Sequence, residues 1–230
     1  MEILKKISGE KEPRTLGEAL KRIGKLEKEL AKAEALAMID SLTGLKTRKY
    51  FEEEVSREIE AMNLDRNRRR ESPRYEHIAI LFLDIDDFKS INDRWGHKIG
   101  DDVLRETAKA IKSMLRDTDI VARYGGEEIV VALLGASEEE AREIAEEKIR
   151  KIIEDSVAEN VRKNNVSREV EMADLRVTVS IGLRPVIEGL SLKKAISDAD
   201  KAMYDAKNKG KNRVVGFDEL TSKERVGIRK

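Results

Sequence analysis

The chain contains no cysteine, which excludes disulfide bonds and any metal site built on thiolates. It has only three prolines and one tryptophan, and glutamine is absent altogether. No apolar run approaches the ~20 residues that cross a membrane, and the first residues lack the apolar core of a secretion signal. We therefore expect a protein without a membrane span, in a reducing, cytoplasmic compartment.

Neither sign of charge dominates, because 46 Lys and Arg residues balance 46 Asp and Glu residues. A net charge of zero gives no reason to expect general attraction to nucleic acid or to an acidic membrane. Charged residues nevertheless make up 40% of the chain, and glutamine is missing. This composition is typical of thermophile proteins, in which ion-pair networks stabilise more and labile amides are avoided. The length of 230 residues suits one domain with extensions.

An amphipathic helix is predicted over 16–39, after a polar segment, 1–14, that shows no periodicity and is expected to be loose. Its apolar residues recur every three or four positions and form a narrow stripe: Leu16, Leu20, Ile23, Leu26, Leu30, Ala33 and Ala37. Such a stripe on a charged helix is typical of a short coiled coil and favours a dimerising helix. The alternative is a helix packed on its own domain.

Helices and strands alternate after residue 40. We expect helices over 48–64, 101–115, 137–155 and 192–209, and strands over 77–83, 175–182 and 213–217. Two apolar runs, 120–122 and 129–134, flank Gly125-Gly126 and predict a β-hairpin. The order indicates one α/β domain over 40–218, with a mixed sheet of about five strands and helices mainly on one side. Residues 219–230 are expected to form a charged tail.

Two groups of acidic residues stand where strands end. Asp84, Asp86 and Asp87 follow the strand over 77–83, and Glu127 and Glu128 stand at the hairpin turn. Carboxylates in such positions are hard oxygen ligands suited to Mg²⁺ or Mn²⁺, and two such ions promote nucleotidyl transfer. Two alternatives remain: the hairpin is only a turn, or Asp86 and Asp87 cap the helix that follows.

Because Mg²⁺ shares its coordination shell with substrate phosphates, a nucleoside triphosphate is the expected partner. Lys89 and the main-chain amides of residues 87–89 are placed to neutralise phosphate charge. No Walker A pattern is present, which argues against a P-loop ATPase. Of the two histidines, His77 begins a strand, and His97 lies in a Gly-His turn where it orients either a loop or a base.

Together these motifs resemble the GGDEF family of diguanylate cyclases, whose fold is like the palm of nucleotide polymerases and class III nucleotidyl cyclases. The resemblance covers about 40–217. It rests on Asp40-x-Leu42-Thr43-Gly44-Leu45, Asp84-Ile85-Asp86-x-Phe88-Lys89-x-Ile91-Asn92-Asp93, Gly96-His97-x-x-Gly100-Asp101, Gly125-Gly126-Glu127-Glu128-Ile129, Val177-Thr178-Val179-Ser180-Ile181-Gly182 and Ala199-Asp200-x-Ala202-Met203-Tyr204-x-Ala206-Lys207. Ile129 replaces the usual Phe, and Thr47 and Lys49 stand where Asn and Arg are usual.

The resemblance implies a role for each matching residue. The implied catalytic groups are Asp84, Lys89, Glu127 and Glu128, and the implied ligands of two Mg²⁺ or Mn²⁺ ions are Asp84, the carbonyl of Ile85, Glu127 and Glu128. Asn92 and Asp101 read the guanine edge, since a carboxylate accepts from guanine donors that adenine lacks. The remaining implied GTP-binding residues are Phe88, His97, Gly125, Gly126, Lys207 and Lys211. Family members more often have Arg at the Lys211 position, and a Lys there offers a point charge instead of a bidentate contact.

The implied reaction condenses two GTP into cyclic di-GMP with loss of two pyrophosphates, across a homodimer whose domains face each other antiparallel. Arg116-x-x-Asp119, which ends six residues before Gly125, matches the family's inhibitory site and implies product inhibition. The alternative for this motif is a helix-end ion pair.

Three rival functions remain at this point. They are a catalytically silent receptor for GTP or cyclic di-GMP, a related cyclase or oligonucleotide synthase with another base preference, and a structural coiled-coil protein. The last leaves the paired acidic sites unexplained, and competition between ATP and GTP in one assay separates the first two.

Overall fold

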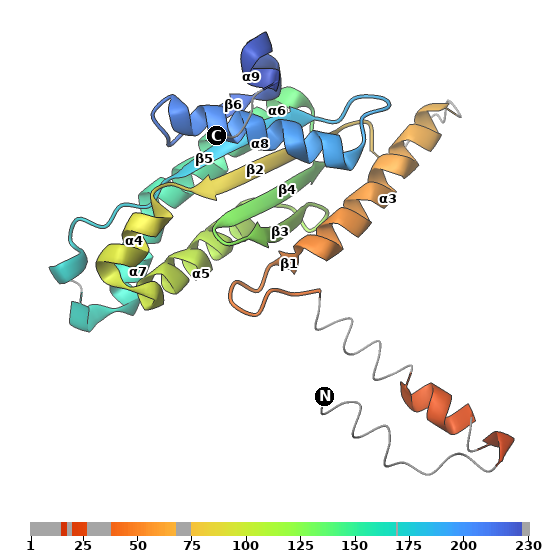
Figure 1. Ribbon diagram of the computed structural model, residues 1–230, viewed down its shortest axis with the longest axis horizontal. Coiled ribbons are helices and arrows are strands. Elements are labelled where there is room, and N and C mark those ends of the chain that lie inside the picture. Colours follow the sequence, from red (N-terminus) through yellow and green to blue (C-terminus); the bar gives the residue numbers. More distant parts are fainter. Residues whose placement is uncertain (1–14, 18–19, 27–37, 68–74, 169, 227–230) are drawn as a thin grey trace. The chain divides into compact units, whose positions relative to one another are not determined.

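The computed structural model describes residues 15–17, 20–26, 38–168 except 68–74, and 170–226 (Figure 1). By its internal contacts the chain divides into two units, Met1–Ile39 and Asp40–Lys230. In the first unit, residues 16–17 and 20–26 are helical, whereas Met38 lies in a turn, so the helix predicted over 16–39 does not reach its expected end. The expected loose segment, 1–14, and the stretch 27–37 lie outside the described residues.

The second unit is built on a six-stranded mixed sheet in the order β1-β3-β4-β2-β5-β6. The strands are β1 (Lys46–Thr47), β2 (Ile78–Ile85), β3 (Ile120–Gly125), β4 (Glu128–Leu134), β5 (Val179–Pro185) and β6 (Val214–Gly216). β2 pairs antiparallel with both β4 and β5, while β1 and β6 add to the two edges in parallel. The predicted α/β class is confirmed. The expected count of about five strands missed β1, which has only two residues and therefore no alternating pattern.

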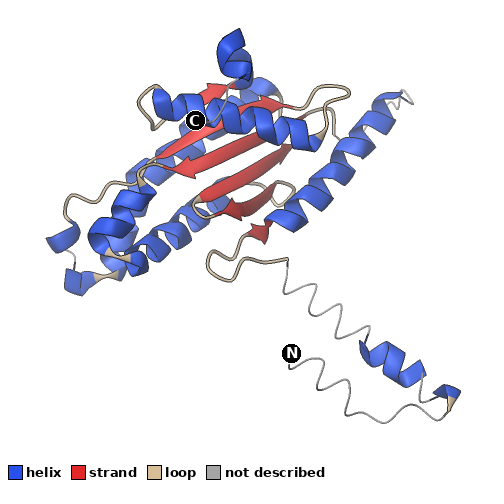
Figure 2. Ribbon diagram, in the orientation of Figure 1, coloured by secondary structure: helices blue, strands red, loops and turns tan. Residues whose placement is uncertain are grey.

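Helices cover both faces of this sheet, so the expectation that they lie mainly on one side is wrong (Figures 1 and 2). One face carries α3 (Arg48–Asn67) and α8 (Leu192–Asn208), and the other carries α4 (Phe88–Trp95), α5 (His97–Met114) and the helical run over 138–164. Successive side chains of β2 point to opposite faces of the sheet, so β2 packs against both helical layers. Ile78, Ile80 and Phe82 pack with α3 and α8, and Ala79, Leu81 and Leu83 pack with α5 and the helical run.

The helical run begins where the sequence predicts and ends later. A capping box joins Ser137 and Glu140 at the start of α6 (Glu138–Glu143). The run continues through two π-helical stretches, η1 (Ile144–Arg150) and η2 (Ile153–Val157), into α7 (Ala158–Asn164). The polar connector expected after residue 155 is therefore helical in its first part, followed by the 3₁₀ turns η3 (Val166–Arg168) and η4 (Val170–Met172).

Two further boundaries differ from the prediction. β5 begins at Val179, and the buried residues before it, Leu175 and Val177, lie in chain without regular secondary structure. The tail expected over 219–230 contains a 3₁₀ turn, η5 (Phe217–Glu219), at its start and a short helix, α9 (Ser222–Val226). The end of α8 agrees with the prediction, since Gly210 follows with φ +110°. None of the helices in the described ranges is long and apolar enough to cross a membrane.

Candidate active site

Two of the acidic residues lie side by side on the sheet. Asp84 at the end of β2 is the antiparallel partner of Glu128 at the start of β4, so both side chains point to the same face. Because Asp84 continues the alternation of Ile80 and Phe82, that face is the one covered by α3 and α8. Gly126 and Glu127 form the turn between β3 and β4, as the hairpin prediction requires.

The acidic residues do not form a closed metal cage by themselves. Among the described residues, no three Asp, Glu, His or Cys side chains come together as a metal-binding group. Glu127 nevertheless lies close enough to Asp84 to disfavour its ionisation. The arrangement is an open row of carboxylates that offers part of a coordination shell and leaves the rest to another molecule.

Lys207 of α8 reaches across to this row. Its Nζ lies 2.7 Å from Asp84 Oδ1, and only 8% of the Asp84 side chain is exposed. Burial raises the pKa of Asp84 above its ordinary value, and the nearby charges of Glu127 and Asp86 add to this, while Lys207 works in the opposite direction. The site therefore holds an excess of negative charge that one lysine only partly compensates.

Asp86 connects the end of β2 to the loop after α8. Its buried carboxylate accepts hydrogen bonds from Thr178 Oγ1 and Ser180 Oγ, both at 2.7 Å, and from the Asn212 amide at 3.1 Å. Asp87, next in the chain, forms an ion pair with Lys211, 2.6 Å from Oδ1 to Nζ. That contact raises the pKa of Lys211.

The alternative that Asp86 or Asp87 caps α4 is wrong. Asp87 occupies the N-cap position but accepts no capping hydrogen bond, and Asp86 binds elsewhere. Asp87, Lys211 and Asn212 are also the described non-glycine residues with positive φ, at 55°, 63° and 47°. Strained backbone of this kind gathers at functional sites, and here it gathers where the two loops meet.

The residues expected to read guanine lie on two adjoining helices. Asn92 is on α4 and Asp101 is on α5, and both are half-buried. Gly100 brings the helices together, because a Cβ built on it would stand 1.9 Å from Asn92 Oδ1. The structure thus places Asn92 directly against the residue that precedes Asp101. Phe88 is buried at the start of α4, whereas Lys89 and His97 are exposed.

The turn of the hairpin is anchored to the start of the domain. Arg123 Nε donates to the carbonyl of Gly126 at 2.8 Å, and its guanidinium also pairs with Asp40 at 3.3 Å. Although burial opposes the effect, hydrogen bonds from Thr43 and the charge of Arg123 lower the pKa of Asp40. Sequence reasoning did not find this clamp, because its partners are 83 positions apart.

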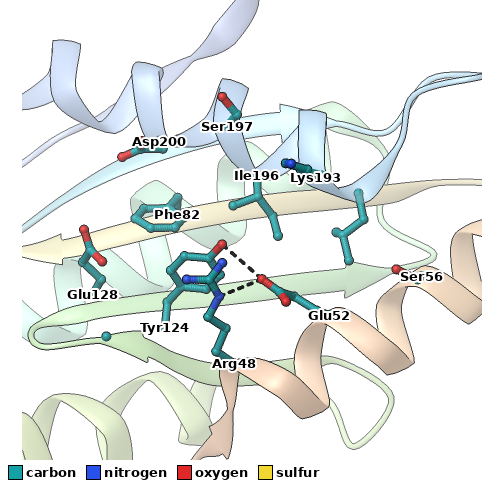
Figure 3. A pocket seen from close by; sticks show the side chains of 12 residues that line it. Arg48, Glu52, Ser56, Phe82, Tyr124, Glu128, Lys193, Ile196, Ser197 and Asp200 are labelled. Atoms are coloured by element: carbon teal, nitrogen blue, oxygen red, sulfur yellow. Dashed lines mark hydrogen bonds and ion pairs between the residues drawn. The ribbon is translucent and has the colours of Figure 1, made fainter. Parts of the chain in front are cut away.

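Beside Glu128, on the same sheet face, lies a groove of about 780 Å³ between α3 and α8 (Figure 3). Its lining includes Phe82 and Tyr124 from the sheet, Arg48 and Glu52 from α3, and Lys193, Ser197 and Asp200 from α8. Arg48 stacks over the Tyr124 ring, 4.2 Å from its centroid, and pairs with Glu52 at 2.7 Å. Glu128, the strand partner of Asp84, thus also borders this groove.

The Arg116–Asp119 segment forms the turn between α5 and β3. The alternative of a helix-end ion pair does not describe it, because Asp119 binds main-chain groups. Its carboxylate accepts from the amide of Arg116 at 3.0 Å and from the amide of Leu134 at 3.1 Å. Arg116 itself is exposed.

Comparison with known proteins agrees with this geometry. The family described as "Diguanylate cyclase, GGDEF domain" matches residues 37–213. "Diguanylate cyclase VdcA" of Vibrio cholerae is 35% identical over 201 residues, which are 87% of this chain and 53% of that protein. "Diguanylate cyclase A" of Treponema denticola is 40% identical over 177 residues, 76% of this chain and 43% of that protein. The chain thus spans about half the length of these relatives.

Solved structures give the same picture. The coiled coil and GGDEF domain of DgcB from Caulobacter crescentus, in complex with c-di-GMP, superposes with a TM-score of 0.67 at 27% identity, covering 87% of this chain and 96% of that one. The GGDEF domain of YfiN from Pseudomonas aeruginosa gives 0.61 at 32% identity, covering 77% and 98%. Both likenesses extend over nearly the whole of the compared chain.

Proposed function

The chain belongs to the GGDEF family of diguanylate cyclases, and from this we propose that it condenses two molecules of GTP into cyclic di-GMP and two pyrophosphates. The observation that carries the proposal is the row formed by Asp84 and Glu128 at paired positions of two strands, with Glu127 in the adjoining turn. Each domain holds one GTP, and the 3′-hydroxyl of one attacks the α-phosphate of the other.

The acidic row fits a divalent metal. Asp84 is a buried carboxylate whose negative charge is incompletely compensated, which is the electrostatic condition that a cation relieves. Mg²⁺ is usually held by one or two carboxylates together with substrate phosphates, so an open row suits it better than a closed cage. Asp84, the carbonyl of Ile85, Glu127 and Glu128 would hold two Mg²⁺ or Mn²⁺ ions. When bound, such ions neutralise phosphate charge and activate an attacking oxygen.

The chain's own residues bind and orient the nucleotide. Asn92 and Asp101 hydrogen-bond to the guanine edge from the adjoining helices α4 and α5. Adenine would leave these side chains without matching partners, which weakens its binding. His97 and Phe88 border this base site. The Gly125-Gly126 turn, in which Gly126 has φ +52°, carries no side chain and lets the nucleotide approach the main chain closely.

Three lysines bind the triphosphate. Lys89 lies on the first turn of α4 beside the left-handed Asp87, where main-chain amides at the helix start add to the positive potential. Lys207 and Lys211 approach from the end of α8 and the loop after it. A lysine at position 211 supplies charge without the planar fork of an arginine, so it orients the phosphate less strictly.

Reaction requires two domains, and the N-terminal helix is proposed to bring them together. Leu16, Leu20 and Ile23 are exposed, between 77% and 51%, and they lie three and four positions apart. Apolar residues in that spacing bury themselves against a second copy in a coiled coil. The homodimer is thus the proposed active form.

Cyclic di-GMP is further proposed to inhibit the enzyme at Arg116 and Asp119. The Arg116 side chain is free to reach a guanine edge or phosphate, while its main-chain amide holds Asp119 in place. Arg116→Ala keeps that amide, so it should fold normally and abolish inhibition by added product. An equal response of the wild type and Arg116→Ala to micromolar cyclic di-GMP would contradict the assignment.

The test of the activity is incubation of the purified chain with Mg²⁺ and GTP, with ATP added in competition, beside Asp84→Ala. Chromatography should resolve cyclic di-GMP from the wild type only. Binding of cyclic di-GMP without any turnover, even at high protein concentration, would refute the proposal and indicate a silent receptor. Products that contain adenine would refute the guanine assignment of Asn92 and Asp101.

A further inference from the structure

The lysines proposed to bind phosphate are already paired with acids at the end of β2. Lys207 Nζ lies 2.7 Å from Asp84 Oδ1, and Lys211 Nζ lies 2.6 Å from Asp87 Oδ1. The first pair joins a proposed phosphate ligand to a proposed metal ligand. Each of these lysines therefore forms an ion pair with an acid of the proposed site.

The two pairs differ in burial, and only one is strong. The Asp84 side chain is 8% exposed and Lys207 is 29% exposed. Asp87 and Lys211 are 61% and 40% exposed, so water and salt screen their attraction. A buried carboxylate depends on its partner, because removing the partner leaves an uncompensated charge. The Lys207–Asp84 pair is thus the contact that ligands must replace.

A cation that binds Asp84 competes with Lys207. Both bind the same carboxylate, and two positive charges a few ångströms apart repel strongly where water is scarce. A triphosphate offers Lys207 a second anion to bind. Each ligand therefore removes an obstacle to the other: the nucleotide draws Lys207 away from Asp84, and a metal on Asp84 frees Lys207 for the nucleotide.

We infer that Lys207 is an exchangeable counter-ion of Asp84, whose transfer to the triphosphate couples metal binding to nucleotide binding. The inference rests on the proposed function, since it takes the metal and triphosphate sites from there. Linkage requires the coupling to be reciprocal, so that nucleotide tightens metal by the same factor as metal tightens nucleotide. Without nucleotide, Lys207 compensates part of the negative charge of the row and so weakens binding of free metal.

The test compares Lys207→Met with Lys209→Met. Lys209 is a matched control, because it follows two residues later at the C-cap of α8 and also pairs with a buried carboxylate, Asp205, at 2.7 Å, which is not a proposed ligand. The probe is Mn²⁺, titrated by electron paramagnetic resonance with and without 3′-deoxy-GTP, which lacks the attacking hydroxyl. Asp84→Asn identifies the share of Mn²⁺ that binds at the row.

Lys207→Met should bind Mn²⁺ in the absence of nucleotide on the order of tenfold more tightly than the wild type, within the usual range of coupling between sites. The factor by which 3′-deoxy-GTP tightens Mn²⁺ should fall, although direct chelation by the triphosphate keeps it above one. Lys209→Met should match the wild type in both. Thermal denaturation supplies a second readout, since Mn²⁺ should raise the melting temperature of Lys207→Met more than that of the wild type.

Equal or weaker binding of nucleotide-free Mn²⁺ by Lys207→Met would overturn the inference, because Lys207 would then be a fixed structural partner of Asp84. Tighter binding that persists in the double variant with Asp84→Asn would overturn it as well, because the metal would lie elsewhere. These measurements need no turnover. A chain that shows the coupling but makes no cyclic di-GMP would refute the proposed function alone.

Discussion

Replacing Asp86 should destabilise the domain more than replacing any one of its partners. Asp86 is 4% exposed and accepts three hydrogen bonds, from two hydroxyl groups and one main-chain amide. Asp86→Ala leaves all three donors without their acceptor. A buried donor without a partner costs about 1–3 kcal/mol, and hydroxyl groups can turn toward other acceptors, so we expect a loss of about 3–5 kcal/mol.

The assay is urea denaturation followed by circular dichroism, applied to a double-mutant cycle with Ser180. Ser180 is fully buried and lies 2.7 Å from Asp86 Oδ1. Ser180→Ala should cost about 1–2 kcal/mol, and the double variant should lose about 1 kcal/mol less than the sum of the single losses, because the orphaned hydroxyl is gone. Asp86→Asn serves if Asp86→Ala does not fold. Losses that simply add, or a loss below about 1 kcal/mol for Asp86→Ala, would refute the role assigned to this network.

Three further predictions follow from the same geometry. Gly182→Ala should lower the free energy of unfolding by more than about 4 kcal/mol or prevent folding, because its Cβ would stand 1.8 Å from the Ala199 carbonyl oxygen. Thermal denaturation measures this loss. A variant as stable as the wild type would contradict the close packing of α8 on β5. Gly100→Ala should fold but bind GTP on the order of tenfold more weakly, because its Cβ would displace the Asn92 side chain. Isothermal titration calorimetry measures the affinity. An unchanged affinity would show that Asn92 does not bind the nucleotide. Burial raises the pKa of Asp84, so its contribution to stability is fully present below the ordinary value of 3.8 and is lost as pH rises through the higher folded value. Asp84→Asn should therefore gain stability relative to the wild type as the pH rises above 3.8, and a difference in melting temperature that does not grow with pH would count against this.

The elements that strong local patterns mark were predictable from the sequence. The hairpin follows from two apolar runs around Gly125-Gly126, and the start of α6 follows from its capping box. The two-residue strand β1 was not predictable, because it exists only through pairing with β3. The continuation of the helical run to Asn164 is not predictable from the largely polar sequence after residue 155, although Val157 and Val161 bury one face of it.

The acids of the candidate site are predictable from the sequence, and the contacts that position them are not. Asp84, Glu127 and Glu128 stand out as acids at strand ends. The sequence gives no sign that Asp86 binds Asn212 rather than capping α4, because these residues are 126 positions apart. The Asp40–Arg123 clamp and the Lys207–Asp84 pair have the same character. Such contacts arise from the crossing of segments in the tertiary fold, and spacing along one chain does not encode them.

The central claim is that two domains of this chain together turn two GTP into one cyclic di-GMP. The most direct measurement is the initial rate of product formation at several protein concentrations, with cyclic di-GMP and pyrophosphate quantified in the same samples. We expect two pyrophosphates for each cyclic di-GMP, and a rate that rises with the square of protein concentration where dimers are scarce. No cyclic di-GMP, another ratio of products, or a rate proportional to protein concentration down to full dissociation of the dimer would contradict it.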